Sequence, residues 1–385
     1  MAKRKEPQIP TPFDAAFEFA GQQVRRLVER YPDQFVAHTV QGRWGIDPSA
    51  WSGSFNGLLP GMMWILHEVS GEAWWAETAE RYSRAVEPLK ALPQVGLGLV
   101  FYHGSHRRWH EATVRAAAPQ ARVVEVMQEA ARTLAGRFSK SARCLIMDPA
   151  APVLAIEDLM NVPLILHTAD LSDDDWLLTI GSQHVATSRR HLVRGDGSTV
   201  GFALMGDHRE CTIRADRAGW QQDSCWARGQ AWAVYGFATC GRLLGFGPWL
   251  ETARQCAYYL IEKLSGDPIP PWDLDASPGL ALPRDSSAAA IAAAGFLELA
   301  QAEQTVGPEQ ARQRQYLQDA ALRILTALCE PEYLAIDDPN WEGILKHGVG
   351  DLEKGLAVDE SVIWGDFFFI EALYRVRRLL RAKRH

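Results

Sequence analysis

The amino-acid sequence predicts an all-α fold that is built from six helical hairpins. Apolar residues recur with the helical period in about twelve segments of similar length. Gly and Pro separate neighbouring segments by only a few residues, as at Gly245, Gly247 and Pro248, and such short breaks are typical of antiparallel helix pairs. The composition, with 47% hydrophobic and 23% charged residues, is that of an ordinary globular protein and excludes a disordered or fibrous chain.

The expected helices follow one another along the whole chain. The helical period places them at 13–31, 56–70, 72–91, 96–104, 109–137, 154–169, 172–194, 226–244, 248–264, 285–305, 308–328 and 362–383. Two of them begin with clear signals. Ser172 precedes three aspartates, which favour the dipole of the first helical turn. Asp285 and two serines precede a run that is rich in alanine, a strong helix former.

Three segments interrupt the helical pattern. Residues 194–225 alternate in polarity and contain Gly and Asp, which predicts a small β-hairpin near 195–215. Residues 265–284, with five prolines, and residues 330–361 are expected to be long loops, which often form functional rims on a compact helical body. No linker or low-complexity segment is visible, so we expect residues 1–385 to form one domain, with 1–12 flexible.

The composition argues against several classes of function. The formal net charge of -7 and the sequence pI of about 5.9 give no electrostatic reason to bind nucleic acid or an anionic membrane. The six cysteines form no C-x-x-C pair and the 11 histidines are dispersed, so we expect neither a disulfide framework nor a metal centre. No apolar run is long enough for a membrane span and no signal peptide is visible, which predicts a cytoplasmic protein. Tryptophan, with 14 residues, is as frequent as phenylalanine, and its flat face suits sugar stacking as well as core packing.

The densest candidate for a binding site is the string W-A-R-G-Q-A-W-A-V-Y-G-F at 226–237, which begins with Trp226. On a helix, Arg228 and Trp232 are four residues apart and share a face. Such an arginine can grip a carboxylate with two hydrogen bonds while the tryptophan ring stacks on a sugar. The alternative is a buried arginine that is paired with an internal aspartate and packed on tryptophan. The spacing favours neither interpretation.

Two adjacent carboxylates, Glu157 and Asp158, are the candidate acids. They lie beside apolar residues near the start of an expected helix. An apolar environment raises the pKa of a carboxyl group and suits it to general acid catalysis. The alternative, which the residues alone favour, is a pair of ordinary first-turn acids that complement the helix dipole.

The string at 226–237 resembles the signature of the unsaturated glucuronyl hydrolases, glycoside hydrolase family 88. The likeness covers about residues 50–380, and the further segments that carry it are 61–64, 192–199, 271–273, 283–292, 359–367 and 371–373. The resemblance implies an (α/α)6 barrel. It also implies a glycoside hydrolase without metal or cofactor that acts on the terminal unsaturated uronic acid of an oligosaccharide. A carboxyl acid protonates the 4,5 double bond, water adds to the adjacent carbon, and the resulting hemiketal opens to release the rest of the sugar.

The resemblance assigns roles to several residues. Glu157 stands at the position of the family's general acid/base aspartate, four residues before Asn161, and Asp158 is the acid if the register is shifted by one. Arg228 and Trp232 match an arginine and a tryptophan that line the substrate site. Trp51 and Trp226 are expected to join them. Glutamate in place of aspartate moves the reacting atom by about an ångström, which in an unchanged pocket costs on the order of 10²-fold in rate.

The chain also departs from the family pattern. The family's H-D-L-G-F motif aligns with residues 95–99, so that Gly96 replaces a second essential aspartate. Family positions for a histidine and a glutamine fall near Gly201 and Ala218. His103 lies seven residues after Gly96, on the same face of the expected helix. A histidine in such a position is most often part of the core or the surface. The functional alternative is that His103 lines the substrate cavity two turns deeper than Gly96.

These departures fit a changed substrate and leave two alternatives open. One is another carbohydrate-active chemistry on the same barrel, and the other is a non-catalytic oligosaccharide-binding protein. In each case we expect an oligosaccharide or acidic sugar as the ligand, no nucleic-acid or membrane partner, and a monomer or homodimer.

Overall fold

The structure is a computed structural model that describes residues 11–45, 53–94, 96–118, 120–146, 152–205, 211–215, 224–277, 279–303 and 307–382. Its α-helices are α1 (Pro12–Arg30), α2 (Leu58–Ser70), α3 (Ala73–Val86), α4 (His106–Arg115), α5 (Ala121–Ala135), α6 (Val162–Ser172), α7 (Asp175–Leu192), α8 (Ala227–Leu244), α9 (Gly247–Lys263), α10 (Ser286–Ala302), α11 (Pro308–Leu328) and α12 (Ile363–Ala382). Shorter helical segments are η2 (Glu87–Ala91), η3 (Leu99–Gly104), η4 (Ile156–Met160) and η6 (Ala335–Asp337). None of the described helices is both long enough and apolar enough to cross a lipid bilayer.

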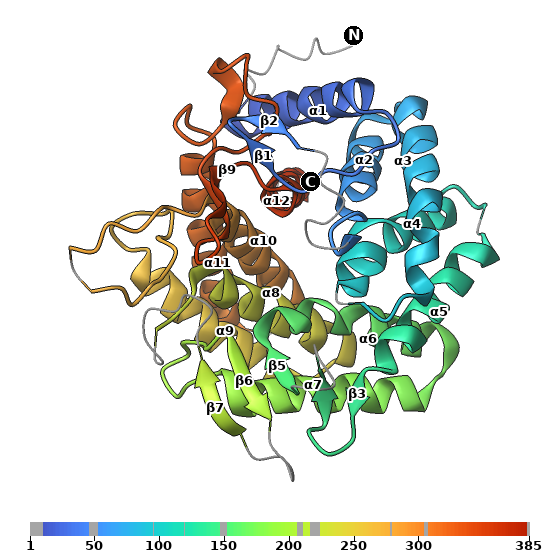
Figure 1. Cartoon of the computed structure of the whole chain (residues 1–385), viewed down its shortest axis with the longest axis vertical. Coiled ribbons are helices and arrows are strands. Elements are labelled where there is room, and N and C mark those ends of the chain that lie inside the picture. Colours follow the sequence, from blue (N-terminus) through green and yellow to red (C-terminus); the bar gives the residue numbers. More distant parts are fainter. Residues whose placement is uncertain are drawn as a thin grey trace.

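The helices form two concentric rings. The inner ring consists of α2, α4 with η3, α6, α8, α10 and α12, and each of these contacts the next until α12 returns to α2. Each of α3, α5, α7, α9 and α11 packs outside the inner helix that precedes it, and α1 packs on α12. In Figure 1 the colours pass around this ring from blue α1 to red α12. The prediction of six helical hairpins is confirmed, and the arrangement is an (α/α)6 barrel.

Two of the inner helices, α8 and α10, are buried on all sides over most of their length because their sequences are largely apolar or small all round. Every residue of α10 from Ser286 to Ala300 is buried, and so is every residue of α8 from Ala227 to Gly241. Small residues let these two helices approach closely: a Cβ added at Gly295 of α10 would lie 3.2 Å from the backbone nitrogen of Tyr235 in α8. The core of the molecule is therefore the wall and interior of the inner ring.

All described strands lie in connections that lead into inner helices. They form the antiparallel pairs β1 (Thr39–Val40) with β2 (Arg43–Trp44), β3 (Phe138–Ser139) with β4 (Cys144–Leu145), and β8 (Gly348–Asp351) with β9 (Leu356–Glu360). A three-stranded sheet has the order β5 (Val153–Ala155), β6 (Phe202–Met205), β7 (Cys211–Ala215). Since the inner helices run parallel to one another, these hairpins gather at the end of the barrel where those helices begin.

The expected β-hairpin near 195–215 is confirmed by β6 and β7. Its third strand was missed, because residues 153–155 belong to β5 and not to a helix that begins at 154. The second expected loop, 330–361, contains β8 and β9 and is not a plain loop.

Two helix boundaries differ from the expected ones. The predicted helix 109–137 is wrong, because α4 ends at Arg115 and α5 begins at Ala121, whereas the turns of η3 lead almost directly into α4. A proline at 119 disfavours a helix interior there. Ser172 does not open α7 but ends α6, and its hydroxyl donates to the carbonyl of Thr168 at 2.7 Å. The N-cap of α7 is Asp174, which accepts from two backbone N–H groups.

Candidate active site

The motif segments converge where the inner helices begin. Backbone hydrogen bonds hold three of them side by side: the N–H of Ala227 donates to the carbonyl of Trp272 at 3.0 Å, and the N–H of Asp285 donates to the carbonyl of Pro270 at 2.9 Å. Bridges between Trp226 and Asp273 and between Pro271 and Arg284 complete this pairing. Segments that are far apart in the sequence thus form one surface at this end of the barrel.

Arg228 is buried at the centre of that surface, with 5% of it exposed. Its Nη1 lies 3.3 Å from Oδ2 of Asp285 and donates to the carbonyl of Val349, while Nη2 donates to the carbonyl of Gly350 at 2.6 Å. The guanidinium carbon lies 4.7, 5.2 and 5.3 Å from the ring centroids of three tryptophans, Trp226, Trp272 and Trp364. This is the geometry of a buried arginine paired with an internal aspartate. A grip on the substrate carboxylate stays a prediction.

The partner of Arg228, Asp285, was singled out from the sequence only as a helix start. Its Oδ1 accepts from the N–H of Ser287 at 3.0 Å and from the N–H of Val349 at 3.3 Å. The hydroxyl of Ser287 in turn accepts from the indole N–H of Trp364 at 3.2 Å. Helix α10, strand β8 and helix α12 are therefore joined to α8 through one buried carboxylate.

Gln230, from the same string, joins a further motif segment. Its side-chain amide donates to the carbonyls of Gly197 at 2.8 Å and Cys256 at 2.9 Å, and its oxygen accepts from the hydroxyl of Thr199 at 2.9 Å. The turn that precedes β6 is thereby fixed against α8. Much of the string at 226–237 thus serves to assemble this end of the barrel.

Glu157 and Asp158 lie on η4, between β5 and α6. The N–H of Ile156 donates to the carbonyl of Gly201 at 3.0 Å, and η4 packs against α8. A Cβ added at Gly229 would lie 3.2 Å from the side chain of Ile156, so the segment approaches the Arg228 region closely. Neighbouring residues of a 3₁₀ turn point in different directions. Accordingly, Glu157 is partly exposed whereas Asp158 is buried, with 2% exposed.

The carboxyl of Asp158 is poorly supplied with donors. Its Oδ1 accepts from the side-chain amide of Asn161 at 3.2 Å, and its buried Oδ2 accepts no hydrogen bond from the described residues. Burial and the negative charge of Glu157 raise the pKa of Asp158 to about 7. Asn161, which is also buried, accepts from the N–H of Gly98 at 3.0 Å. It therefore holds η4 against the segment that begins at Gly96.

Gly96 occupies the position where the resemblance implies a second aspartate. Its φ is +92°, and an added Cβ would lie 2.5 Å from the Cβ of Ser54 and 2.8 Å from the Ser54 carbonyl oxygen. A Cβ at Gly98 would lie 2.3 Å from the Cα of Asn161. The backbone here leaves no room for a side chain, so the loss of this carboxylate is built into the local conformation.

Of the remaining predicted site residues, Trp232 and His103 are buried in the barrel, and the third lies outside the described residues. Trp232 is buried, one turn further along α8 than Arg228, and its ring centroid lies 5.3 Å from that of Phe368. His103, in η3, is buried among aromatic rings and donates from Nε2 to the carbonyl of Met160 at 3.1 Å. Burial lowers the pKa of His103 to about 3 and keeps it neutral. Trp51 lies outside the described residues. Within the described chain, no group of three or more His, Cys, Asp or Glu side chains is placed to hold a metal ion.

Comparisons with known proteins agree with this geometry. A scan of the sequence against models of protein families finds no match. The chain is 30% identical over 334 residues to the unsaturated glucuronyl hydrolase of Bacillus sp. strain GL1, across 84% of this chain and 86% of the relative. It is 26% identical over 376 residues to the unsaturated chondroitin disaccharide hydrolase of Streptococcus pyogenes serotype M1, across 94% and 90% of the two chains.

A solved structure supports the same relationship to the unsaturated glucuronyl hydrolases. A variant of UGL with the oligosaccharide dGlcA-Glc-Rha-Glc superposes with a TM-score of 0.86 at 27% identity, over 94% of this chain and 96% of that one. The similarity therefore extends over nearly the whole barrel and includes the end where the motif segments meet. The chain belongs to the unsaturated glucuronyl hydrolases, glycoside hydrolase family 88.

Proposed function

We propose that this protein hydrates the 4,5 double bond of an unsaturated uronic acid, or of a related acidic sugar, at the end of an oligosaccharide, with Glu157 as the general acid/base. The observation that carries the assignment is the different exposure of the two neighbouring carboxylates: Glu157 is partly exposed beside the motif segments, whereas Asp158 is buried. A group must reach the reacting atom to exchange a proton with it. The dGlcA-terminated oligosaccharide that is named with the similar structure supports this substrate class.

The proposed reaction needs one proton and one water molecule. The carboxyl of Glu157 donates its proton to C4 of the double bond, and the ring oxygen stabilises the positive charge that develops at C5. Water then adds to C5 while the Glu157 carboxylate takes up one of its protons, which regenerates the acid. The product is a hemiketal that opens to a ketone, and the hemiacetal left at C1 then releases the rest of the oligosaccharide.

Asp158 supports Glu157 by its protonation state. Because burial and the nearby Glu157 raise the pKa of Asp158 to about 7, this carboxyl remains largely neutral in weakly acidic solution. A neutral Asp158 adds no second negative charge beside Glu157.

The test compares two isosteric variants on a panel of unsaturated disaccharides, with loss of the double-bond ultraviolet absorbance as the measurement. We expect the wild type to consume at least one member, Glu157→Gln to lose on the order of 10²-fold to 10⁴-fold in kcat, and Asp158→Asn to lose less than tenfold. Unfolding midpoints control for misfolding. The assignment is overturned if no member is consumed, if Glu157→Gln keeps full activity, or if Asp158→Asn suffers the larger loss.

One observation favours a second candidate, a protein that binds oligosaccharides without turning them over. The segment around Gly96 has neither a carboxylate nor room for one. Titration calorimetry with the same panel separates the two functions, because the second candidate predicts heats of binding with no change in absorbance.

A further inference from the structure

A cavity lies at the opposite end of the barrel, away from the motif segments. It is lined by side chains from α4, α8, α10, α11 and α12 and has a volume of about 650 Å³. Along α8 it begins near Arg242, 14 residues beyond Arg228, which corresponds to about 21 Å of helix. Charged side chains dominate its wall: Arg107, Arg108, Arg242, Arg314, Arg375 and Arg378, with Glu111, Glu298 and Glu371.

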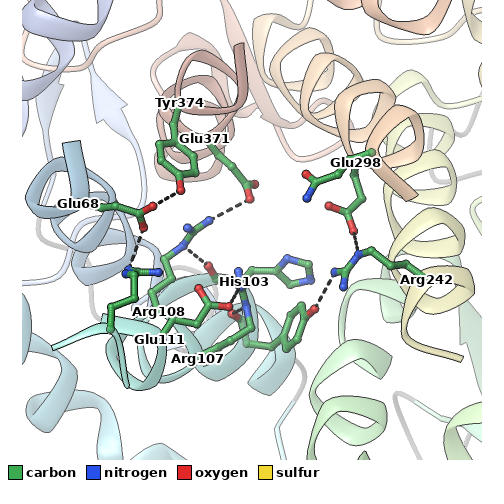
Figure 2. A network of polar contacts seen from close by, with 12 residues as sticks. Glu68, His103, Arg107, Arg108, Glu111, Arg242, Glu298, Glu371 and Tyr374 are labelled. Carbon is green, nitrogen blue, oxygen red and sulfur yellow. Dashed lines mark hydrogen bonds and ion pairs between the residues drawn. The ribbon is translucent and has the colours of Figure 1, made fainter. Parts of the chain in front are cut away.

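The three carboxylates of the cavity are already occupied by arginines. Glu298 lies 2.7 Å from Nε of Arg242 and 2.7 Å from Nη2 of Arg375. Glu371 lies 2.9 Å from Arg108 and 3.1 Å from the same Nη2 of Arg375. Figure 2 shows Arg108 pointing toward Glu371 and Arg242 pointing toward Glu298.

Glu111, the third carboxylate, pairs with Arg107 at 2.5 Å, so four arginines share three carboxylates. The other two lining arginines, Arg314 of α11 and Arg378 of α12, form no ion pair with a described carboxylate. Arg378 donates only to the hydroxyl of Tyr374, at 3.1 Å. Six guanidinium groups against three carboxylates leave the cavity wall with a formal charge of +3.

The titratable groups around the cavity agree with a positive local potential. Burial alone would raise the pKa of Glu298, but Arg375 and Arg242 outweigh it and hold this pKa at about 2. Burial and then the charge of Arg107 lower the pKa of His167 to about 4. Carboxylates are thus kept ionised and a nearby histidine is kept neutral. A further anion in this cavity would be stabilised in the same way.

We propose that this cavity binds a tetrahedral dianion, the sulfate or phosphate group of a small ligand. Arginines recognise such oxyanions through paired, charge-assisted hydrogen bonds. A wall charge of +3 is better matched by a dianion than by a single carboxylate, which distinguishes the ligand from a simple uronate. The volume is in the range of small-molecule sites. This proposal stands independently of the reaction proposed for the other end.

The first test is calorimetric binding of sodium sulfate, with sodium chloride at equal ionic strength as the reference. The informative variant is Arg314→Ala/Arg378→Ala, because neither arginine supports a buried carboxylate. Its matched control is Arg312→Ala/Arg381→Ala, which removes the same charge from the same two helices but away from this cavity. We expect saturable binding to the wild type and the control, and binding weakened by at least tenfold in the informative variant.

The second measurement is the thermal unfolding midpoint as a function of ligand concentration. Sulfate stabilises most proteins by exclusion from the surface, and this part of the shift is the same in all variants. A bound ion adds a saturable shift, which we expect in the wild type and the control and not in Arg314→Ala/Arg378→Ala. Inorganic phosphate, glucose 6-phosphate and glucuronate form the remaining arms. Binding of either phosphate supports the site, and the better of the two identifies a free or a sugar-borne group.

The proposal is overturned by either of two results. One is a response to sulfate and to both phosphates that equals the chloride response or that persists unchanged in the informative variant. The other is glucuronate binding more tightly than both sulfate and phosphate, which would assign the cavity to a carboxylate.

Discussion

The two ends of the barrel hold their charges in different ways, although the same inner helices build both. At the motif end one buried arginine, Arg228, is enclosed by three tryptophan rings and one carboxylate. At the opposite end six arginines and three carboxylates line one cavity, and four of these arginines pair with the carboxylates; part of this network is drawn in Figure 2. The first arrangement leaves little unmatched charge, and the second leaves an excess.

Helix direction accounts for part of this difference. The inner helices present their N-termini at the motif end, where carboxylates are favourable, and their C-termini at the other, where cations are favourable. Asp285 caps α10, and Asp366 in the first turn of α12 accepts from the N–H groups of Ile344 and Leu345 at 2.9 Å each. Arg242 lies in the last turn of α8. Because the buried acids Asp285 and Asp366 are held by backbone donors, a partly exposed acid such as Glu157 is the better placed to react.

The largest expected effect is the loss of Arg228, the buried arginine of the motif end. Arg228→Met keeps the packing of the side chain but leaves Asp285 without its cationic partner in a place where water does not reach. We expect the free energy of unfolding to fall by about 3–5 kcal/mol, measured by urea denaturation. At the opposite end Glu298→Gln should cost less, about 1–3 kcal/mol. Arg375 still pairs with Glu371, and the side chain of Arg242 is 38% exposed and therefore reaches water.

A loss at Arg228→Met no larger than at Glu298→Gln would contradict the comparison. It would mean that solvent or a backbone shift compensates Asp285 as readily as it compensates the charges of the opposite cavity.

The next effect concerns the segment that replaces the expected aspartate. Gly96→Ala combines a left-handed φ of +92° with a Cβ 2.5 Å from that of Ser54, and we expect it to cost about 3 kcal/mol. Gly279 is a matched control, because its φ is +94° and nothing lies within 4 Å of an added Cβ. Gly279→Ala should cost about 1 kcal/mol, the backbone strain alone. Equal urea midpoints for the two variants would show that the contact with Ser54 relaxes without cost.

The same expectation extends to activity. If the absent carboxylate were merely missing, Gly96→Asp would raise turnover on the unsaturated disaccharides. The close approach of Ser54 predicts that this variant instead loses stability and gains no activity.

The helical hairpins follow from the local sequence pattern and were predicted. The contacts between segments that are far apart in the sequence form only when the barrel closes, and these were missed. Helix period and the alanine-rich run of α10 were sufficient for the hairpins, whereas the break after Arg115 was missed because good helix formers on both sides outweighed the signal of the proline at 119. A buried arginine with an aspartate partner was one of two interpretations of Arg228, but its partner Asp285 lies 57 residues away and spacing does not identify it. The arginine cavity was not predicted at all, since its members meet only when α4, α8, α10, α11 and α12 pack together.

The pH dependence of stability also distinguishes the two ends. At the motif end the folded-state pKa of Asp158, raised to about 7, exceeds its ordinary value of 3.8, so between about pH 4 and 7 the folded protein retains a proton that the unfolded chain has lost. Stability from this group therefore falls as the pH rises through that window, by up to about 1.4 kcal/mol per pH unit. At the opposite end the pKa of Glu298, held at about 2, lies below its ordinary 4.5. Its contribution to the free energy of unfolding is therefore present above about pH 4.5 and is lost as the pH falls toward 2.

Urea denaturation at intervals between about pH 4 and 7 measures this difference. The free energy of unfolding should fall less steeply with pH for Asp158→Asn than for the wild type, whereas Glu298→Gln should keep the wild-type slope in this range. Parallel curves for Asp158→Asn and the wild type would place the Asp158 carboxyl in contact with solvent, and the contrast between its environment and that of Glu157 would no longer hold.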